Sequence, residues 1–490
     1  MQKSEIDVNF PGQFRLAKIN DKKFPHWEVL KFNKWALEYC PTLNVTLLFD
    51  NEQLGIGCIL GYAITFDGVL IRDSLTLPVS QNSDLFEDSI ESFISSLAGR
   101  YAVLIITDKV TRVYIDPAGQ MSVVFSPEEM LVGSSLYVIS DISKPLIDLA
   151  DKVNIPEVDS FYPFGITPHE GVKRLQPNHF LDLKDFIERR HWPRPGELST
   201  RSSKNIESTV ASIRKKLRRN ILAVIDQHPV CMPLTAGRDS RMLLATVLDR
   251  VDEIQFFTMR LPDENARLDC RVAASLAKRF HLKHQILEWQ EASAEELDTW
   301  QIRVGRSCAG RTWRAVRTRL QLDPERIFLP GAIGEMFRGD LWEDSHFSSK
   351  AISTEDLILL VKKPNQPMIS KAAAHWLSNL PLTNPLDVLD FFDLEQMFGG
   401  MSAPSHYGHV NNPIITVLSD RHILAQAMEL PADYRFQKLF ANDLIQQYSQ
   451  KMANIPFNED IGPRAIYKRA KWKCRGAARK AVSAAKLLFR

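Results

Sequence analysis

The chain has 490 residues, of which 44% are hydrophobic and 24% charged, a balance that excludes a largely disordered protein. Its longest clean apolar run, 101–106, is far shorter than the roughly 20 residues of a membrane-spanning helix. Residues 1–10 lack the apolar core of a signal peptide, so we expect a cytoplasmic protein. At roughly 150 residues each, two to four domains are expected. The six cysteines show no CxxC spacing, which indicates neither a zinc site nor a disulfide framework.

The net charge of +2 is unevenly distributed along the chain. Residues 464–490 contain ten Lys or Arg and no Asp or Glu, so residues 1–463 carry about −8. The pattern of this basic segment predicts a helix with apolar groups at Tyr467, Trp472 and 487–489. We expect the helix to dock on the acidic remainder of the chain. Contact with an anionic membrane surface is the second interpretation, and nucleic-acid binding is the last.

Short apolar runs predict a β-rich N-terminal domain over residues 1–190. The runs 45–50 and 101–106 have the length of strands, and 111–115 is expected to return from the second run in a hairpin. Residues 191–206 are rich in proline and serine, which predicts a linker after this domain.

Beyond the linker the pattern changes to strands that alternate with helices. Strands are expected at 230–234, 253–259, 285–287 and 327–329, and helices at 206–227, 240–248 and 266–280. This alternation predicts an α/β fold class, with a parallel sheet whose faces are covered, in a domain over residues 205–463. From about 350 the chain is expected to be mainly helical, with turns at Pro364, Pro381, Pro385 and Pro431.

The most informative segment is LTAGRDS at 234–240, between an expected buried strand and a helix. Small residues at 235–237 let backbone N–H groups face outward, and the helix adds the positive end of its dipole, so the loop suits pyrophosphate. Asp239 is placed to bind Mg²⁺, which prefers carboxylates with phosphate oxygens, and Arg238 and Arg241 add positive charge. A tight turn with Asp239 as N-cap explains the same residues. The loop lacks GK[ST], so it is not a Walker A loop.

The sequence TAGRDS resembles the SGGxDS pyrophosphate loop of the asparagine synthetase family. Residues 255–287 are similar to the family's second strand, the following helix with an Asp, and the LG..H segment. Residues 327–340, IFLPGAIGEMFRGD, are similar to LSGxGxDELFGGY. Upstream, 99–101 and 116–119 are similar to GxF…RDxxG of the glutaminase half. The resemblance extends from about 95 to 440, and three ordered segments favour nucleotide binding over a simple turn.

The resemblance implies a ligase that depends on ATP and Mg²⁺. Such enzymes transfer AMP to a carboxylate and release pyrophosphate, and an amine then attacks the acyl-adenylate to form an amide. The implied metal ligands are Asp239 and Glu335, and Phe257 and Thr258 are implied to lie against the adenine, with plain strand core as the alternative for Phe257. The implied partners are a small-molecule or peptide carboxylate and an amine. The cofactor-binding residues carried over are Leu234, Thr235, Ala236, Gly237, Arg238, Asp239, Ser240, Phe257, Thr258 and Gly331.

The chain departs from the family in its N-terminal half, which implies that glutamine hydrolysis is lost. The glutaminase half of the family uses an N-terminal cysteine beside its own amine, whereas residue 2 is Gln. Cys40 and Cys58 are the only cysteines of this region, and buried packing is the usual role of a free cysteine. No counterpart of the family's NGEIYN segment is found. We expect a degenerate glutaminase-like domain, and an amine that is free ammonia or part of the substrate.

Two further motifs are altered. The family has adjacent Asp and Glu after its small-residue turn, but here only Glu335 remains, as a second Mg²⁺ ligand or as an acid stabilised by a helix dipole. His409 and Asn411 fall where synthetases have the Glu and Arg of ExRxPF. His409 is a candidate catalytic base, with a structural hydrogen-bonding role as the alternative. The family's late lysine has no identifiable counterpart, and Lys438 and Lys451 are candidates by position alone.

Three functions remain open from the sequence. The leading one is adenylation of a carboxylate that ends in an amide; β-lactam synthetases and lasso-peptide cyclases resemble the same family and also manage without glutaminase chemistry. The second is a non-catalytic nucleotide-binding or scaffold protein, which the altered motifs favour and the intact Asp239 opposes. The third is an asparagine synthetase that uses ammonia. The sequence does not specify the acyl substrate, the amine donor or the oligomeric state.

Overall fold

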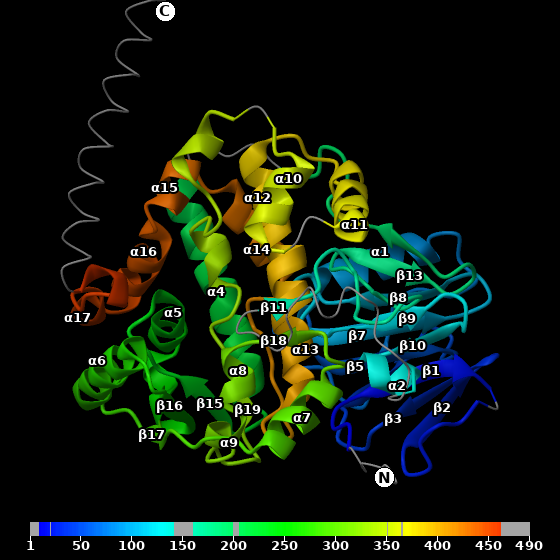
Figure 1. Cartoon of the computed structure of the whole chain (residues 1–490), viewed down its shortest axis with the longest axis horizontal. Coiled ribbons are helices and arrows are strands. Elements are labelled where there is room, and N and C mark those ends of the chain that lie inside the picture. Colours follow the sequence, from blue (N-terminus) through cyan, green and yellow to red (C-terminus); the bar gives the residue numbers. More distant parts are fainter. Residues whose placement is uncertain are drawn as a thin grey trace, which may run out of the picture.

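The computed structural model describes residues 9–19, 21–141, 160–198, 205–349, 351–363 and 366–461. Figure 1 shows a β-rich N-terminal region, blue to cyan, beside a region of mixed helices and strands formed by the rest of the chain. The basic segment 464–490 and the turn at Pro364 lie outside the described residues, so both stay predictions. Within the described ranges, no helix combines the length and the apolar character that crossing a bilayer requires.

Two mostly antiparallel sheets form the N-terminal region. The first has the order β12-β9-β10-β1-β3-β2 and contains β1 (Phe14–Lys18), β2 (Glu28–Phe32), β3 (Trp35–Tyr39), β9 (Val124–Ser126), β10 (Leu131–Gly133) and β12 (Lys173–Arg174). The second has the order β14-β13-β8-β7-β5-β4-β6 and contains β4 (Val45–Phe49), β5 (Gly55–Ile64), β6 (Ser74–Thr76), β7 (Ala98–Ile106), β8 (Thr111–Ile115), β13 (His179–Asp182) and β14 (Ile187–Arg190). Phe14 and Trp35 of the first sheet share a buried cluster with Leu60 and Leu104 of the second, so the sheets pack face to face.

The strands predicted in this region are confirmed. The run 45–50 forms β4, 101–106 lies within β7, and 111–115 is β8, which pairs antiparallel with β7 as a hairpin requires. Every residue of β7 is buried, because helix α1 (Phe86–Ser96) packs on one face of its sheet and the other sheet covers the opposite face. This double coverage explains why β7 reads as a continuous apolar run.

A four-stranded parallel sheet carries the loop at 234–240. Its order is β17-β16-β15-β19, and its strands are β15 (Val230–Pro233), β16 (Ile254–Arg260), β17 (His284–Glu288) and β19 (Ile327–Phe328). Helices α4 (Ile206–Ile225), α5 (Arg238–Thr246) and α6 (Glu264–Phe280) alternate with these strands, which confirms the predicted alternation. The four carboxyl ends meet at one edge of the sheet, where open α/β sheets bind ligands.

The remainder of the chain is mainly helical, as predicted. It contains α7 (Ala294–Arg303), α8 (Arg311–Arg314), α9 (Val316–Arg319), α10 (Thr354–Leu360), α11 (Pro367–Ser378), α12 (Pro385–Phe392), α13 (Ala403–Ser405), α14 (Arg421–Glu429), α15 (Ala432–Phe436), α16 (Leu439–Tyr448) and α17 (Gln450–Ala453). Pro385 opens α12 and Pro431 is the N-cap of α15, because a proline lacks the N–H that an interior position needs. The elements that were not predicted include the pairing of β11 (Ser160–Phe161) with β18 (Cys308–Ala309), and a π-helix at Asp393–Ser402.

The two regions are joined by buried polar contacts. Arg190 of β14 contacts Glu395 of the π-helix at 2.6 Å, and Ser419 Oγ donates to Asp116 Oδ1 at 2.5 Å. Trp192, in the stretch predicted as a linker, is buried against Phe391 with ring centroids 4.9 Å apart. The described part of that stretch, 191–198, is therefore packed at its start against the helical region.

Candidate functional site

The loop between β15 and α5 directs its backbone N–H groups at oxygen atoms of the protein itself. The N–H of Ala236 donates to Asp269 Oδ1 at 2.9 Å, that of Gly237 to Thr235 Oγ1 at 3.1 Å, and that of Thr235 to Ser240 Oγ at 3.2 Å. One of these acceptors is a carboxylate, so the loop already binds an anionic group through its backbone. A nucleotide phosphate at this place would compete with Asp269 for the N–H of Ala236.

Asp239 lies in the first turn of α5, where the helix dipole favours a negative charge. The N-cap of the helix is Gly237 and no side chain caps it, so the alternative in which Asp239 is the N-cap is wrong. The carboxylate of Asp239 is instead directed at the segment that follows β19. The first motif therefore presents Asp239 to the second.

Two glycines after β19 pack directly on Asp239. A Cβ atom placed on Gly334 would lie 2.1 Å from Asp239 Oδ1, and one on Gly331 would lie 3.0 Å from Asp239 Cβ. The distance at Gly334 leaves no room for a side chain unless Asp239 moves, and the distance at Gly331 is tighter than an ordinary van der Waals contact. The small-residue turn of the second motif is thus explained by its close approach to the carboxylate of the first.

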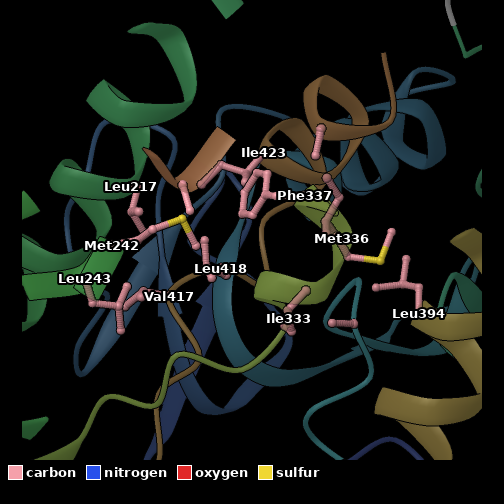
Figure 2. Packing of buried hydrophobic residues seen from close by; sticks show 14 of the residues in the cluster. Leu217, Met242, Leu243, Ile333, Met336, Phe337, Leu394, Val417, Leu418 and Ile423 are labelled. Carbon is pink, nitrogen blue, oxygen red and sulfur yellow. The ribbon is translucent and has the colours of Figure 1, made fainter. Parts of the chain in front are cut away.

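One of the two residues between these glycines has an unusual backbone. Ile333 has φ of +77°, in the left-handed region, which a β-branched residue rarely adopts. Its side chain is fully buried and packs with Met336 and Phe337 in the cluster drawn in Figure 2, where Met242 and Leu418 are also labelled. Apolar burial therefore holds a strained turn in place, and strain of this kind is concentrated at functional sites.

Arg338 bridges the carboxylates of the two motifs. Its Nη1 donates to Asp239 Oδ1 at 2.7 Å and its Nη2 donates to Glu335 Oε1 at 2.8 Å. Its Nε donates to Asp340 Oδ1 at 3.3 Å. One guanidinium thus serves three carboxylates, and these four groups together retain negative charge.

Burial and like charges raise the pKa of the acids in this cluster. The pKa of Glu335 rises to about 7, because burial and the charge of Asp239 outweigh the opposing charge of Arg338. The pKa of Asp393, the first residue of the π-helix, lies well above its usual value because of burial and the charges of Glu335 and Asp340. Perturbed acids of this kind are typical of functional sites.

Asp239 and Glu335 supply oxygen donors of the type that Mg²⁺ prefers. Glu335 Oε2 is buried and has no hydrogen-bond partner, so it is available as a ligand. The guanidinium of Arg338 nevertheless lies between the two acids, and among the described residues no group of three or more His, Cys, Asp or Glu is arranged to hold a metal. The two acids fit Mg²⁺ once Arg338 has moved aside and water or phosphate oxygens complete its ligands.

Residues 455–460, which we call the strap, lie against the loop. Arg241 donates to the carbonyl oxygens of Ile455 at 2.8 Å and Pro456 at 3.1 Å. The N–H of Asn458 donates to the carbonyl oxygen of Ala236 at 2.9 Å. The strap is thus hydrogen-bonded both to α5 and to the loop that precedes it.

The end of the strap places acidic side chains on the loop's positive charge. Arg238 Nη1 lies 3.4 Å from Glu459 Oε1, and its Nη2 lies 3.7 Å from Asp460 Oδ2. The Arg238 guanidinium also lies 4.4 Å from the ring centroid of Phe457. Lys438, proposed by position as the late lysine, donates to Glu459 Oε2 at 2.7 Å. The strap acids therefore contact the guanidinium of Arg238 in the way that phosphate oxygens would.

The residues assigned to the adenine are engaged within the protein. The ring of Phe257 is buried beside Phe328, with centroids 5.5 Å apart, in a cluster with Leu287, which is the strand-core alternative. Thr258 Oγ1 donates to the carbonyl oxygen of Leu234 at 2.5 Å and lies 2.8 Å from His284 Nε2. The side chains of Phe257 and Thr258 thus pack and hydrogen-bond within the sheet beneath the loop.

His409 lies away from Asp239 and Glu335. The bridge between Phe328 and Ile414 is parallel, so residues before 414 extend toward the amino end of β19, whereas the second motif follows its carboxyl end. Asn412 Nδ2 confirms this direction, because it donates to the carbonyl oxygens of Asp323 and Arg326, which precede the strand.

The surroundings of His409 keep its ring neutral. It lines a cavity of about 220 Å³ together with residues of α7 and α9. Burial and the charge of Arg319 hold the pKa of His409 well below its usual value. The structure thus brings Asp239, Gly331 and Glu335 together and leaves His409 at the other edge of the sheet.

A larger cavity opens at the carboxyl ends of β16 and β17. Its volume is about 720 Å³, and Trp289 and Trp313 are among its lining residues. Asn265 also lines it and lies one helical turn before Asp269, the residue that accepts the N–H of Ala236. Residues one turn apart share a helix face, so this cavity is next to the loop.

Four groups of this site had no role assigned from the sequence: Arg338, Asp269, Asp393 and the strap acids. Arg338 is recognisable in the sequence only as a replacement for a family glycine. Asp269 lies in the helix whose sequence resembles the family's Asp-containing helix, but its contact with the loop depends on the packing of α6. The strap acids lie 221 and 222 residues after Arg238 in the sequence, and no local pattern marks a pairing between charged residues so far apart.

Comparison with known proteins adds no family assignment. A scan against models of protein families finds no match for this chain, and no curated protein matches it. The chemistry and geometry of the site therefore carry the functional proposal.

Proposed function

We propose that the chain is an ATP-dependent ligase that adenylates a carboxylate and passes the acyl group to an amine. The observation that supports this most strongly is the meeting of two distant motifs. Asp239 of the loop and Glu335 of the turn after β19 converge on one guanidinium at the carboxyl edge of a parallel sheet. That edge is where such sheets bind nucleotides, and the resemblance of both motifs to the asparagine synthetase family supports the same site.

In this proposal ATP lies with its β- and γ-phosphates on the loop at 235–240. The N–H groups of the loop and the first turn of α5 bind phosphate oxygens, and Arg238 turns from the strap to the phosphates. Asp239 and Glu335 would hold Mg²⁺, which would neutralise the phosphates and stabilise the leaving pyrophosphate.

The reaction has two steps. A substrate carboxylate oxygen attacks the α-phosphorus, the bond from that phosphorus to the bridging oxygen breaks, and pyrophosphate leaves with the bonding electrons. An amine then attacks the acyl carbon, AMP leaves, and the nitrogen loses a proton as the amide forms. The cavity of about 720 Å³ beside the loop is of a suitable volume for the carboxylate substrate. Its two tryptophans favour a substrate with a planar apolar group.

A second candidate function is a non-catalytic nucleotide-binding or scaffold protein. It is favoured by the contacts of Asp269 and the strap acids, which fill anion-binding positions of the loop with the protein's own carboxylates. It also fits the bridge of Arg338 between the two acids.

The test is ATP–pyrophosphate exchange with Mg²⁺, with pooled amino acids, aromatic carboxylic acids or a cell extract as the acyl source. The ligase predicts exchange in at least one pool, its loss in Asp239→Ala, and its retention in Asp84→Ala, a substitution of an exposed carboxylate in the N-terminal region. ATP binding without exchange in any pool would favour the scaffold.

A further inference from the structure

We propose that Arg338 is an internal counter-cation that occupies the divalent-cation position between Asp239 and Glu335, and that a metal ion binds there only when Arg338 leaves. The inference relies on the proposed function for the position of the metal and not for catalysis. It gives Arg338 a regulatory role at the site, since it couples the binding of the metal to the binding of the nucleotide.

The geometry of the bridge supports this role. The two Nη atoms of one planar guanidinium contact carboxylates from segments that follow different strands, at 2.7 and 2.8 Å. The Arg338 side chain is only 13% exposed, so these contacts are shielded from solvent and salt. Charge-assisted hydrogen bonds of this length are among the stronger polar contacts in proteins. A guanidinium that bridges two acids takes the place that a cation would take.

The site nevertheless has room for more positive charge. Asp239, Glu335 and Asp340 share one guanidinium, and Glu335 Oε2 is buried without a hydrogen-bond partner. A buried carboxylate oxygen without a partner is costly, so it marks a position for a further donor or cation. Arg338 therefore satisfies the cluster only in part, as an exchangeable occupant would.

The exchange couples the metal to the nucleotide. Free Mg²⁺ must break the contacts of Arg338, so its apparent affinity is reduced by the small fraction of molecules in which Arg338 has left. A polyphosphate beside the loop offers the released guanidinium new oxygen acceptors, which lowers the cost of its departure. Metal and nucleotide should thus bind with positive coupling, and each should raise the affinity of the other.

The inference is tested by titrating Mg²⁺ alone into the full chain, with binding followed by calorimetry and by the shift of the melting temperature. Arg338→Met removes the charge while keeping an unbranched apolar stem. We expect this variant to bind Mg²⁺ at least about tenfold more tightly than the wild type, which corresponds to about 1.4 kcal/mol. The matched control is Arg317→Met, since Arg317 is exposed and pairs with Glu296 away from the site.

A third variant keeps the test decisive. Adding Glu335→Gln to Arg338→Met should abolish the gain, because one of the two ligands is then lost. If the Met variant does not fold, Arg338→Lys gives the same reading, because a lysine cannot bridge two carboxylates as a fork and should increase Mg²⁺ affinity by a smaller factor. Unchanged or weaker Mg²⁺ binding in the folded Met variant, or in Arg338→Lys if it replaces it, would overturn the inference.

The experiment distinguishes failure of this inference from failure of the proposed function. A gain in Mg²⁺ affinity in Arg338→Met without any ATP binding would keep Arg338 as the counter-cation and refute the nucleotide site. ATP binding to the wild type together with no gain in the variant would do the reverse.

Discussion

Asp239 is the residue at which the two motifs meet, and its position is set by what its neighbours lack. Gly334 and Gly331 leave the space that the carboxylate fills, and the buried side chain of Ile333 holds the turn between them in a left-handed conformation. The side chains around Asp239 therefore act by shape as much as by charge. This makes the site sensitive to a single added methyl group.

We predict that Gly334→Ala displaces the Asp239 carboxylate, because the new Cβ would lie 2.1 Å from Oδ1. The expected loss is about 1–3 kcal/mol in the free energy of unfolding, as for other overpacked sites. Chemical denaturation measures it. The control is Gly55→Ala, since a Cβ at Gly55 meets nothing within 4 Å. An equal effect of the two substitutions would contradict the close approach.

At the scale of elements, the strap and the loop behave as one unit. The strap contributes acids to Arg238 and backbone oxygens to Arg241, so both cations beside the loop are occupied. A nucleotide would have to draw Arg238 away from the strap. On the proposed function, the strap would lower the affinity of the loop for anions until a polyphosphate displaced its acids.

We predict that Glu459→Gln with Asp460→Asn raises the affinity for ATP by about two- to tenfold at low salt, because two competing charges are removed from Arg238. The gain should shrink as salt is added. Calorimetric titration measures both. The control pair is Asp226→Asn with Glu253→Gln, whose acids contact Arg250 at the surface. Weaker ATP binding in the strap variant would mean that the acids assist the nucleotide instead.

The sequence predicts well those helices and strands whose own residues show the spacing of apolar side chains that a buried face requires. The strands at 230–234 and 253–259 and the helix at 266–280 occur within a few residues of their predicted limits, because each buries a face that its own sequence defines. The meeting of Asp239 with the second motif follows from the resemblance and from the shared edge of the sheet. These strands, this helix and the meeting of the two motifs can therefore be predicted without knowing which distant side chains contact one another.

The rest of the site depends on contacts that local patterns do not encode. Arg338, the strap acids and Asp269 act through pairings between segments that only the folded chain brings together. The position of His409 depends on residues 413–415, which pair parallel with β19. This pairing places His409 near the amino end of β19, whereas the order of the motifs would place it with Asp239 and Glu335 at the carboxyl end. The π-helix at Asp393 follows α12 directly and has no distinct sequence period.

At the scale of the whole molecule, buried polar groups join the N-terminal sheets to the helical region. His406 Nδ1 lies 3.3 Å from the carbonyl oxygen of Gln120, across the boundary between the two regions. Burial and the charges of Arg100 and Arg319 hold the pKa of His406 well below its usual value. The burial of His191 beside Arg421 lowers its pKa in the same way. These histidines are neutral in the folded protein near neutral pH.

We predict that the protein loses stability as the pH falls from 7 to 5. Because the folded pKa of His406 is depressed, the unfolded chain binds a proton near pH 6.5 that the folded chain does not, and protonation then favours unfolding. Each such histidine should contribute up to about 1.4 kcal/mol per pH unit below 6.5. Melting temperatures across this range measure the slope. His406→Gln should reduce it, whereas substitution of the exposed His26 should not.

The most direct test of the central claim is calorimetric titration of Mg²⁺·ATP and of pyrophosphate into the full chain. The account predicts saturable binding of both ligands, with Mg²⁺·ATP weakened at least about tenfold, or about 1.4 kcal/mol, in Asp239→Ala and unchanged in Asp84→Ala. Absence of binding by either ligand to the folded wild type would contradict it. The loop would then be a strand–helix turn whose N–H groups serve only the protein's own carboxylate.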